Sequence, residues 1–276
     1  MKKNIILASL KETFSLIRKH KLLVLALFIL QVLFFSALTI AQIKYQVVIA
    51  GNLQSMTEYF DNLNLDDEAV AEKILQKKDI LDMSGVYGNY DIILRTLKSM
   101  VITTFFIFAL LNGINWAFTD RIIARKSVRE FFIHVGKFFL ISLFYGILIL
   151  VIILSFMKTS FADLVVDNNI GPNLIYFVLG LVVLYFMFIS FALVGRTTLK
   201  DIFRKTFLIG IKKAHIILLA YIINIAVVDL LFFLLYLAID WQFWILLIIT
   251  IFFFFSFILA RIFLLLVVEK LNKEIK

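Results

Sequence analysis

The stretches LKETFSLIRK (Leu10–Lys19), VREFFIHVGK (Val128–Lys137) and FRKTFLIGIK (Phe203–Lys212) share one pattern: a basic residue second, Phe fifth and Lys tenth. Each lies just upstream of a long apolar run. We interpret them as three copies of one membrane-surface helix, each leading into a transmembrane hairpin. Chance is the alternative, because 31 of the 276 residues are Phe. The unequal spacing of the copies favours repetition, since a longer outer loop in the first hairpin accounts for it.

The composition places the chain in a membrane. Hydrophobic residues make up 63% of it and its mean hydropathy is +1.02, whereas a soluble domain is about half apolar. The net charge of +9 comes from residues that flank apolar runs, which favours anionic lipid over nucleic acid as the partner. The absence of cysteine excludes disulfides and thiolate metal sites and leaves the redox compartment open.

Six apolar stretches are long enough to cross a bilayer, which takes about 20 residues per helix; they are 22–43, 100–118, 138–157, 174–194, 215–239 and 242–268. The sequence therefore predicts an all-α polytopic membrane protein with six transmembrane helices in three hairpins, each preceded by a cytoplasmic interfacial amphipathic helix. Basic residues concentrate in the segments expected on the cytoplasmic side, which are 1–21, 119–137, 195–214 and 269–276. Because such segments resist translocation, both termini are expected in the cytoplasm of a cell-membrane protein.

The three amphipathic helices are expected to grip the cytoplasmic leaflet. In the first, Ile6, Leu10, Phe14 and Ile17 fall along one helical face, with the charged residues on other faces. The expected headgroup ligands are basic residues of the three segments, namely Lys11, Arg18, Lys19, Arg129, Lys137, Arg204, Lys212 and Lys213. The expected interfacial anchors are the aligned Phe14, Phe132 and Phe207.

The outer segment 44–99 is expected to be an extracytoplasmic helical insertion, and 158–173 a short outer loop. Residues 44–60 can continue the first membrane helix, and Asp66 or Asp67 can cap a further helix through Met83. The oxygen ligands from Asn62 to Glu68 suggest a calcium loop. However, Asp67 stands where an EF-hand needs Gly, which favours a solvated acidic loop.

Asp229 is the strongest single candidate for a functional residue inside the membrane. An acid within a membrane helix costs free energy unless it is protonated, paired or in contact with water. It is either a proton or cation site, or a structural acid that reaches the outer interface or a neighbouring helix. The amides of Asn112, Asn115 and Asn224 either bond neighbouring helices or line a shared polar pathway. Arg261 is expected to lie too far from Asp229 to pair with it.

The sequence contains no recognisable motif for an enzyme active site or a metal site. His20, His134 and His215 lack the i, i+4 spacing of a zinc pair and are expected at the interface. No residue set supplies a nucleophile with its base, so no enzyme activity, cofactor or metal is expected. With Pro172 the only proline and glycine scarce, the membrane helices are expected to be continuous.

The three basic stretches and the six-helix topology resemble a group of prokaryotic membrane families. These include the YciC-like inner-membrane proteins and the membrane domain attached to some glycerophosphodiester phosphodiesterases. The acidic segment 44–98 departs from that pattern. The resemblance implies a membrane domain without catalytic residues, because the phosphodiesterase chemistry does not reside there.

Two functions follow as hypotheses. The first is a non-enzymatic membrane protein that organises anionic lipid or a partner membrane protein at the cytoplasmic leaflet. The alternative is a permease or transporter subunit with an intramembrane polar site at Asp229 and Asn224.

Overall fold

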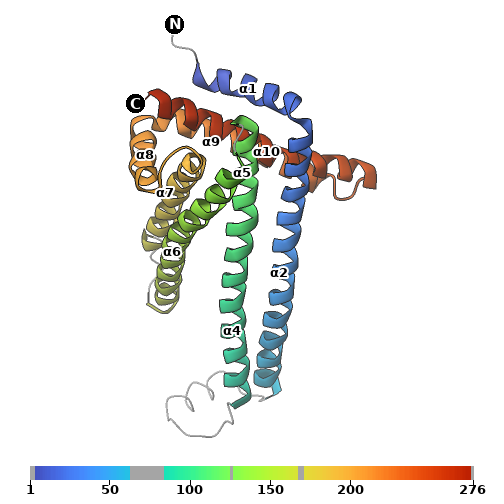
Figure 1. The fold of residues 1–276 in the computed structure, drawn as a ribbon. Coiled ribbons are helices and arrows are strands. Elements are labelled where there is room, and N and C mark those ends of the chain that lie inside the picture. Colours follow the sequence, from blue (N-terminus) through green and yellow to red (C-terminus); the bar gives the residue numbers. More distant parts are fainter. Residues whose placement is uncertain (1–3, 63–83, 125–126, 167–170, 275–276) are drawn as a thin grey trace. The chain divides into compact units, whose positions relative to one another are not determined.

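The computed structural model describes residues 4–62, 84–124, 127–166 and 171–274, and within these ranges every regular element is a helix (Figure 1). The α-helices are α1 (Ile5–Lys19), α2 (Lys21–Asn62), α4 (Ser84–Ile107), α5 (Gly113–Ile123), α6 (Val128–Val166), α7 (Gly171–Leu193), α8 (Leu199–Lys212), α9 (Ala214–Leu237) and α10 (Phe243–Glu274). A π-helical turn, Phe108–Asn112, joins α4 to α5.

Six helical stretches are long and apolar enough to cross a membrane, which confirms the predicted number. They are Lys21–Tyr59, Val86–Ile123, Val128–Phe156, Leu174–Leu193, Ala214–Leu237 and Phe243–Glu274. The helix expected from Asp66 or Asp67 to Met83 and the calcium loop suggested beside it lie outside the described residues.

Helix α2 continues far past the first predicted span. Its 42 residues rise by about 63 Å at 1.5 Å each, roughly twice the hydrocarbon thickness of a bilayer. The expected continuation of the first membrane helix over 44–60 is therefore a single uninterrupted helix with the membrane span itself.

The chain divides into two compact units. Unit 2 covers Phe34–Phe108 and pairs the distal part of α2 with α4. There the Tyr45 hydroxyl and the Thr103 hydroxyl share a hydrogen bond of 2.8 Å, and the ring of Phe34 lies 6.3 Å from that of Phe108.

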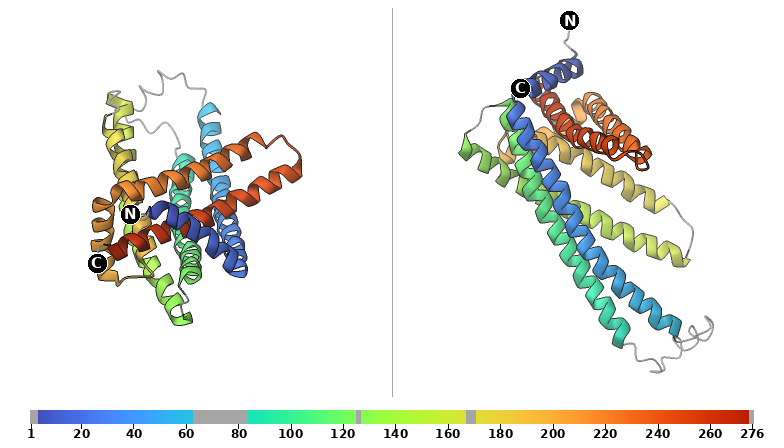
Figure 2. Two further views of the ribbon diagram at one scale, coloured as in Figure 1. Left: turned by 90° about the horizontal axis from the view of Figure 1, so that it is seen from above. Right: turned by 90° about the vertical axis from the view of Figure 1, so that its right-hand side faces the viewer.

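Unit 1 covers Met1–Leu33 and Ala109–Lys276, and the C-terminal half of α10 is its core. Within this unit α10 packs against α1, α5, α7, α8 and α9, and Figure 2 shows α9 and α10 side by side in both views. The residues from Ile262 to Val268 are all buried. The first turns of α10 are instead exposed and apolar, with Trp244 68% and Phe252 57% exposed, as expected of a surface that faces lipid.

The second span is continuous as expected, over Val86–Ile123, but it is not α-helical throughout. The π-turn Phe108–Asn112 interrupts the α-helical geometry, and Gly113 follows directly. A Cβ atom at Gly113 would lie 3.0 Å from Cδ1 of Phe138, so a residue without a side chain lets the Phe138 ring approach the backbone here. Such turns are often found where a helix carries a functional side chain, and Asn112 closes this one.

The three basic stretches do not all form separate helices. In the first and third copies the helix stops at aligned positions, His20 and Lys213, whose backbone angles are not helical. The middle copy continues into the membrane span as part of α6, with the corresponding Phe138 fully buried. The separate surface helix expected over 119–137 was therefore wrong.

Helix α6 begins at Val128 because Ser127 and Glu130 cap it reciprocally. The Ser127 backbone N–H donates to the Glu130 carboxylate at 2.9 Å, and the Glu130 N–H donates to the Ser127 hydroxyl at 3.3 Å. This pair satisfies two backbone donors that the first turn leaves open.

Candidate functional site

Helix α1 exposes a row of alternating apolar and basic side chains. Leu7, Lys11, Phe14 and Arg18 are spaced by four, three and four residues, so they share one helical face. All four are exposed, with Leu7 56% and Phe14 55% exposed. This arrangement corrects the predicted face, which grouped Phe14 with Ile6, Leu10 and Ile17 and set the charges apart.

Helix α8 exposes a row at the aligned positions, in which two basic residues precede two apolar ones. Lys200, Arg204, Phe207 and Ile211 have the same spacing and are exposed, with Phe207 51% and Ile211 68% exposed. We call these two rows of four residues the exposed stripes. In the middle copy Arg129 is exposed as well.

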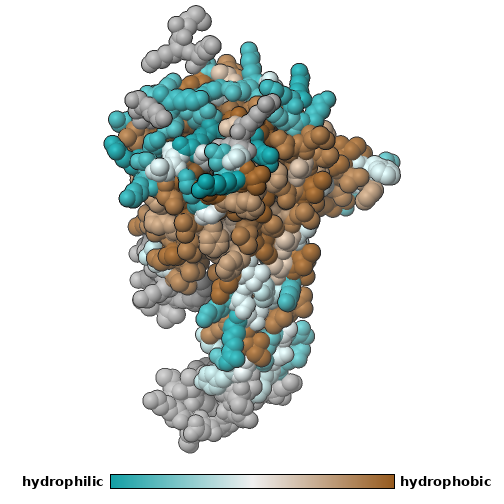
Figure 3. All heavy atoms as spheres, in the orientation of Figure 1, coloured by the Kyte–Doolittle hydropathy of each residue, from teal (hydrophilic) through white to brown (hydrophobic). Residues whose placement is uncertain are grey.

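The three aligned phenylalanines are all exposed. Phe132 in the first turns of α6 is 67% exposed, slightly more than Phe14 and Phe207. An exposed phenylalanine at one position of all three copies is what an anchor in lipid requires. On the face drawn in Figure 3, hydrophilic atoms gather at the end of unit 1 that carries α1 and α8.

Small polar residues lie on the buried sides of α1 and α8. Ser9 and Thr13 of α1 are buried, and the Thr13 hydroxyl donates to the Ser9 carbonyl at 2.9 Å. Thr206 of α8 lies 3.0 Å from the Ser190 hydroxyl, which bonds Tyr145 at 2.8 Å. Small hydroxyl residues let helices approach closely. The Thr13 bond lies within α1, whereas the contact of Thr206 with Ser190 joins α8 to α7.

The predicted headgroup ligands fall into two groups. Two of them are engaged within the protein: the Lys137 ammonium donates to the Thr197 carbonyl at 3.0 Å, and Lys213 pairs with Glu274 at 3.0 Å. The others have exposed side chains, namely Lys11, Arg18, Lys19, Arg129, Arg204 and Lys212.

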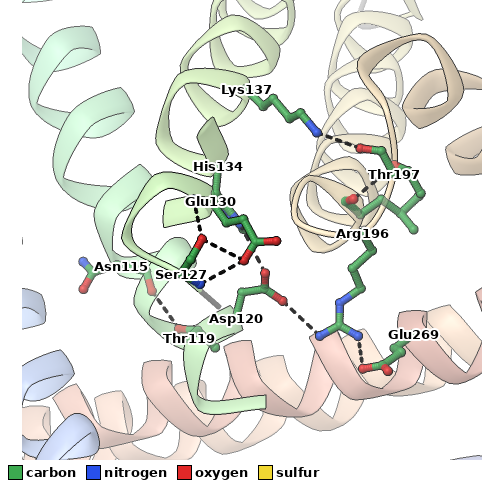
Figure 4. A network of polar contacts seen from close by, with 11 residues as sticks. Asn115, Thr119, Asp120, Ser127, Glu130, His134, Lys137, Arg196, Thr197 and Glu269 are labelled. Carbon is green, nitrogen blue, oxygen red and sulfur yellow. Dashed lines mark hydrogen bonds and ion pairs between the residues drawn. The ribbon is translucent and has the colours of Figure 1, made fainter. Parts of the chain in front are cut away.

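A buried ion-pair network joins four parts of unit 1 (Figure 4). Asp120 of α5 is 1% exposed and lies 3.0 Å from Nη2 of Arg196, in the connection between α7 and α8. Its other oxygen is 3.4 Å from Nδ1 of His134 in α6. Arg196 also contacts Glu269 of α10, which pairs with Lys273 at 2.8 Å. His134, expected at the interface, is instead 3% exposed.

The charges in this network hold one another in place. Burial lowers the pKa of the Arg196 guanidinium from its ordinary value, and the adjacent Asp120 carboxylate opposes that shift. Because arginine stays protonated in proteins, Asp120 serves as the counter-ion that makes its burial tolerable.

Arg261 of α10 lies in a second polar cluster, between three and four helical turns before the C-terminal end of α10 at Glu274. Its Nη2 donates to the Gln31 side-chain oxygen at 2.8 Å and to that of Asn112 at 3.5 Å. The guanidinium lies 5.8 Å from the centre of the Trp116 ring. Gln31 is 2% exposed and Arg261 8% exposed, so the protein encloses this cation.

The other intramembrane polar residues do not form one site. Asn224 donates to the Ala260 carbonyl of α10 at 3.1 Å, which ties α9 to α10. Asp229 is exposed on α9, and Asn115 is fully buried on α5. The side chains proposed for a permease site, Asp229 and Asn224, are thus turned to different surroundings.

Sequence reasoning missed Asp120, Arg196 and Glu269. Each lies at the end of an apolar run, where a charged residue is ordinarily exposed to solvent. The only signal was the stretch 119–126, which follows an apolar span and has one acid, Asp120, among three basic residues.

Within the described ranges, no group of three or more His, Cys, Asp or Glu side chains is placed to hold a metal ion. No family model, curated protein or solved structure matches the chain, so its function has to be inferred from its own contacts.

Proposed function

We propose that this protein is a non-enzymatic, multi-pass protein of the cell membrane that organises anionic lipid, or a partner membrane protein, at the cytoplasmic leaflet. The observation that carries this proposal is the pair of matched exposed stripes on α1 and α8. They occur at aligned positions of sequence copies that lie far apart in the chain.

The composition of the stripes suits a membrane surface better than water or hydrocarbon. Exposed Leu7 and Phe14 gain free energy by entering the acyl boundary, at about 25 cal/mol per Å² of apolar surface. Lys11 and Arg18 alternate with them and can reach lipid phosphates from the same face. The fold fixes the opposite faces of both helices, so each stripe is available to lipid without rearrangement.

Removing the α1 charges is expected to reduce the preference for anionic lipid. A basic side chain near an anionic surface contributes about 1 kcal/mol, so Lys11→Gln with Arg18→Gln should lower relative association at least about fivefold. The measurement is the fraction of motionally restricted spin-labelled phosphatidylglycerol, compared with phosphatidylcholine, around the reconstituted full chain.

The matched control removes the same charge from unit 2. Arg95 and Lys98 are exposed on α4, and Arg95→Gln with Lys98→Gln should leave the preference unchanged. Equal losses in both variants would show that net charge, rather than the α1 stripe, selects the lipid.

The proposed topology places both termini and the short helices in the cytoplasm. The chain has no cysteine, so single cysteines report on accessibility directly. Ser15 of α1 and Ser55 of α2 are both exposed. In intact cells a membrane-impermeant maleimide should label Ser55→Cys, and should label Ser15→Cys only after permeabilisation. The reverse pattern would reject this orientation.

A further inference from the structure

Arg261 carries a buried positive charge without an acidic partner among the described residues. Its two protein acceptors, Gln31 and Asn112, are neutral amides, and both bonds leave from Nη2. The other terminal nitrogen, Nη1, is buried and finds no protein acceptor in the described part of the chain.

The acids of unit 1 that the structure describes are engaged elsewhere or exposed. Asp120 and Glu269 bind Arg196, and Glu12 and Glu274 pair with lysines. The remaining acids whose side chains the structure describes cap helices or are exposed on or after α9, namely Glu130, Asp201, Asp229 and Asp240. No described carboxylate is therefore placed to neutralise Arg261.

A second buried donor lies on the same helix as one of these acceptors. Asn115 is 0% exposed, and neither atom of its side-chain amide has a protein partner among the described residues. It stands three residues from Asn112, and residues so spaced are neighbours on a helix. Figure 4 shows its side chain pointing away from the Asp120 network.

We propose that Arg261, cradled by Gln31, Asn112 and Trp116, is a binding site for a small inorganic anion such as a halide. A guanidinium offers charge-assisted hydrogen bonds, which strengthen where water is excluded. The enclosure of Arg261 favours an ion of one atom over a lipid phosphate. This site is separate from the exposed stripes and does not depend on headgroup binding.

Trp116 provides the readout, because it is 3% exposed and adjacent to Arg261. Trp241 and Trp244 are 56% and 68% exposed, so Trp241→Phe with Trp244→Phe leaves Trp116 as the only tryptophan of the chain. In the full chain in nanodiscs, at constant ionic strength with gluconate, iodide should quench Trp116 saturably. Chloride should reverse the quenching.

Arg261→Gln should weaken iodide binding about tenfold or more, the equivalent of one charge-assisted hydrogen bond. Arg18→Gln, which removes a cation from the exposed α1 stripe, should leave iodide binding unchanged. Two results would overturn the proposal. One is quenching that rises linearly with iodide concentration and is unaffected by chloride. The other is quenching of Trp116 in Arg261→Gln equal to that in the parent. If Arg261→Gln does not fold, the test rests on the variant in which Trp116 is the only tryptophan. Chloride must then reverse the iodide quenching for the proposal to stand.

Discussion

Replacing Asp120 with Asn is expected to lower the free energy of unfolding by about 3 kcal/mol, because it removes the more deeply buried of the two counter-ions of Arg196. The amide keeps the shape of the carboxylate, so packing changes little. Glu269 still contacts Arg196, which places the effect at the lower end of the range for breaking a buried pair. The measurement is equilibrium unfolding in mixed micelles.

Two further variants separate charge from packing. Arg196→Gln added to Asp120→Asn removes the stranded cation, while Glu269 keeps Lys273, so the double variant should recover part of the loss. Asp91→Asn breaks an exposed pair with Arg95, in which the two side chains are 60% and 82% exposed. It should cost within about 0.5 kcal/mol. A loss of equal size in Asp91→Asn would contradict the assigned role of burial.

The positions of the membrane-spanning helices follow from the sequence because each span is set by a local property. A run of about 20 apolar residues has few ways to satisfy its backbone in lipid other than a helix. The six predicted spans therefore match the six helices, with differences at their ends. The continuation of α2 past the first span was also expected. No proline interrupts residues 21–62, although the continuation includes Gly51 and polar residues.

The face that α1 buries was not predictable from apolar periodicity. That reasoning grouped Ile6, Leu10, Phe14 and Ile17 on one face turned to lipid. In a membrane protein the lipid is as apolar as the core, and small polar residues can mark the helix contact instead. Ser9 and Thr13 are buried together with Ile6, while Leu7 and Phe14 are exposed, so the apolar side chains of α1 are divided between the two faces.

The two buried polar clusters depend on contacts between distant parts of the chain. Asp120 and Arg196 are 76 residues apart, and Arg261 and Gln31 are 230 residues apart. Nothing in either local sequence distinguishes a charge that folds inward from one that stays in solvent. The π-turn at Phe108–Asn112 was missed likewise, because the ring of Phe138 that Gly113 accommodates comes from another helix.

Gly210→Ala is expected to lower the free energy of unfolding by about 2 kcal/mol through overpacking. A Cβ atom there would lie 2.6 Å from Cε1 of Phe186 and 3.2 Å from Cδ1 of Ile189. The chain cannot simply move apart, since the Gly210 carbonyl accepts the Tyr185 hydroxyl at 2.8 Å. The Phe186 ring also packs against Phe207, with centroids 4.8 Å apart, so its displacement disturbs the exposed stripe of α8.

Gly180→Ala on α7 is the matched control, because a Cβ atom there meets nothing within 4 Å. Alanine is the better helix former by up to about 1 kcal/mol, so this variant should be as stable as the parent or more so.

The two variants Gly210→Ala and Gly180→Ala also test how the fold supports lipid binding. Since the contact at Gly210 holds α8 against α7, Gly210→Ala should also reduce the preference for anionic lipid, and Gly180→Ala should not. Loss of stability with unchanged lipid preference would mean that the α8 stripe does not depend on this contact for its orientation.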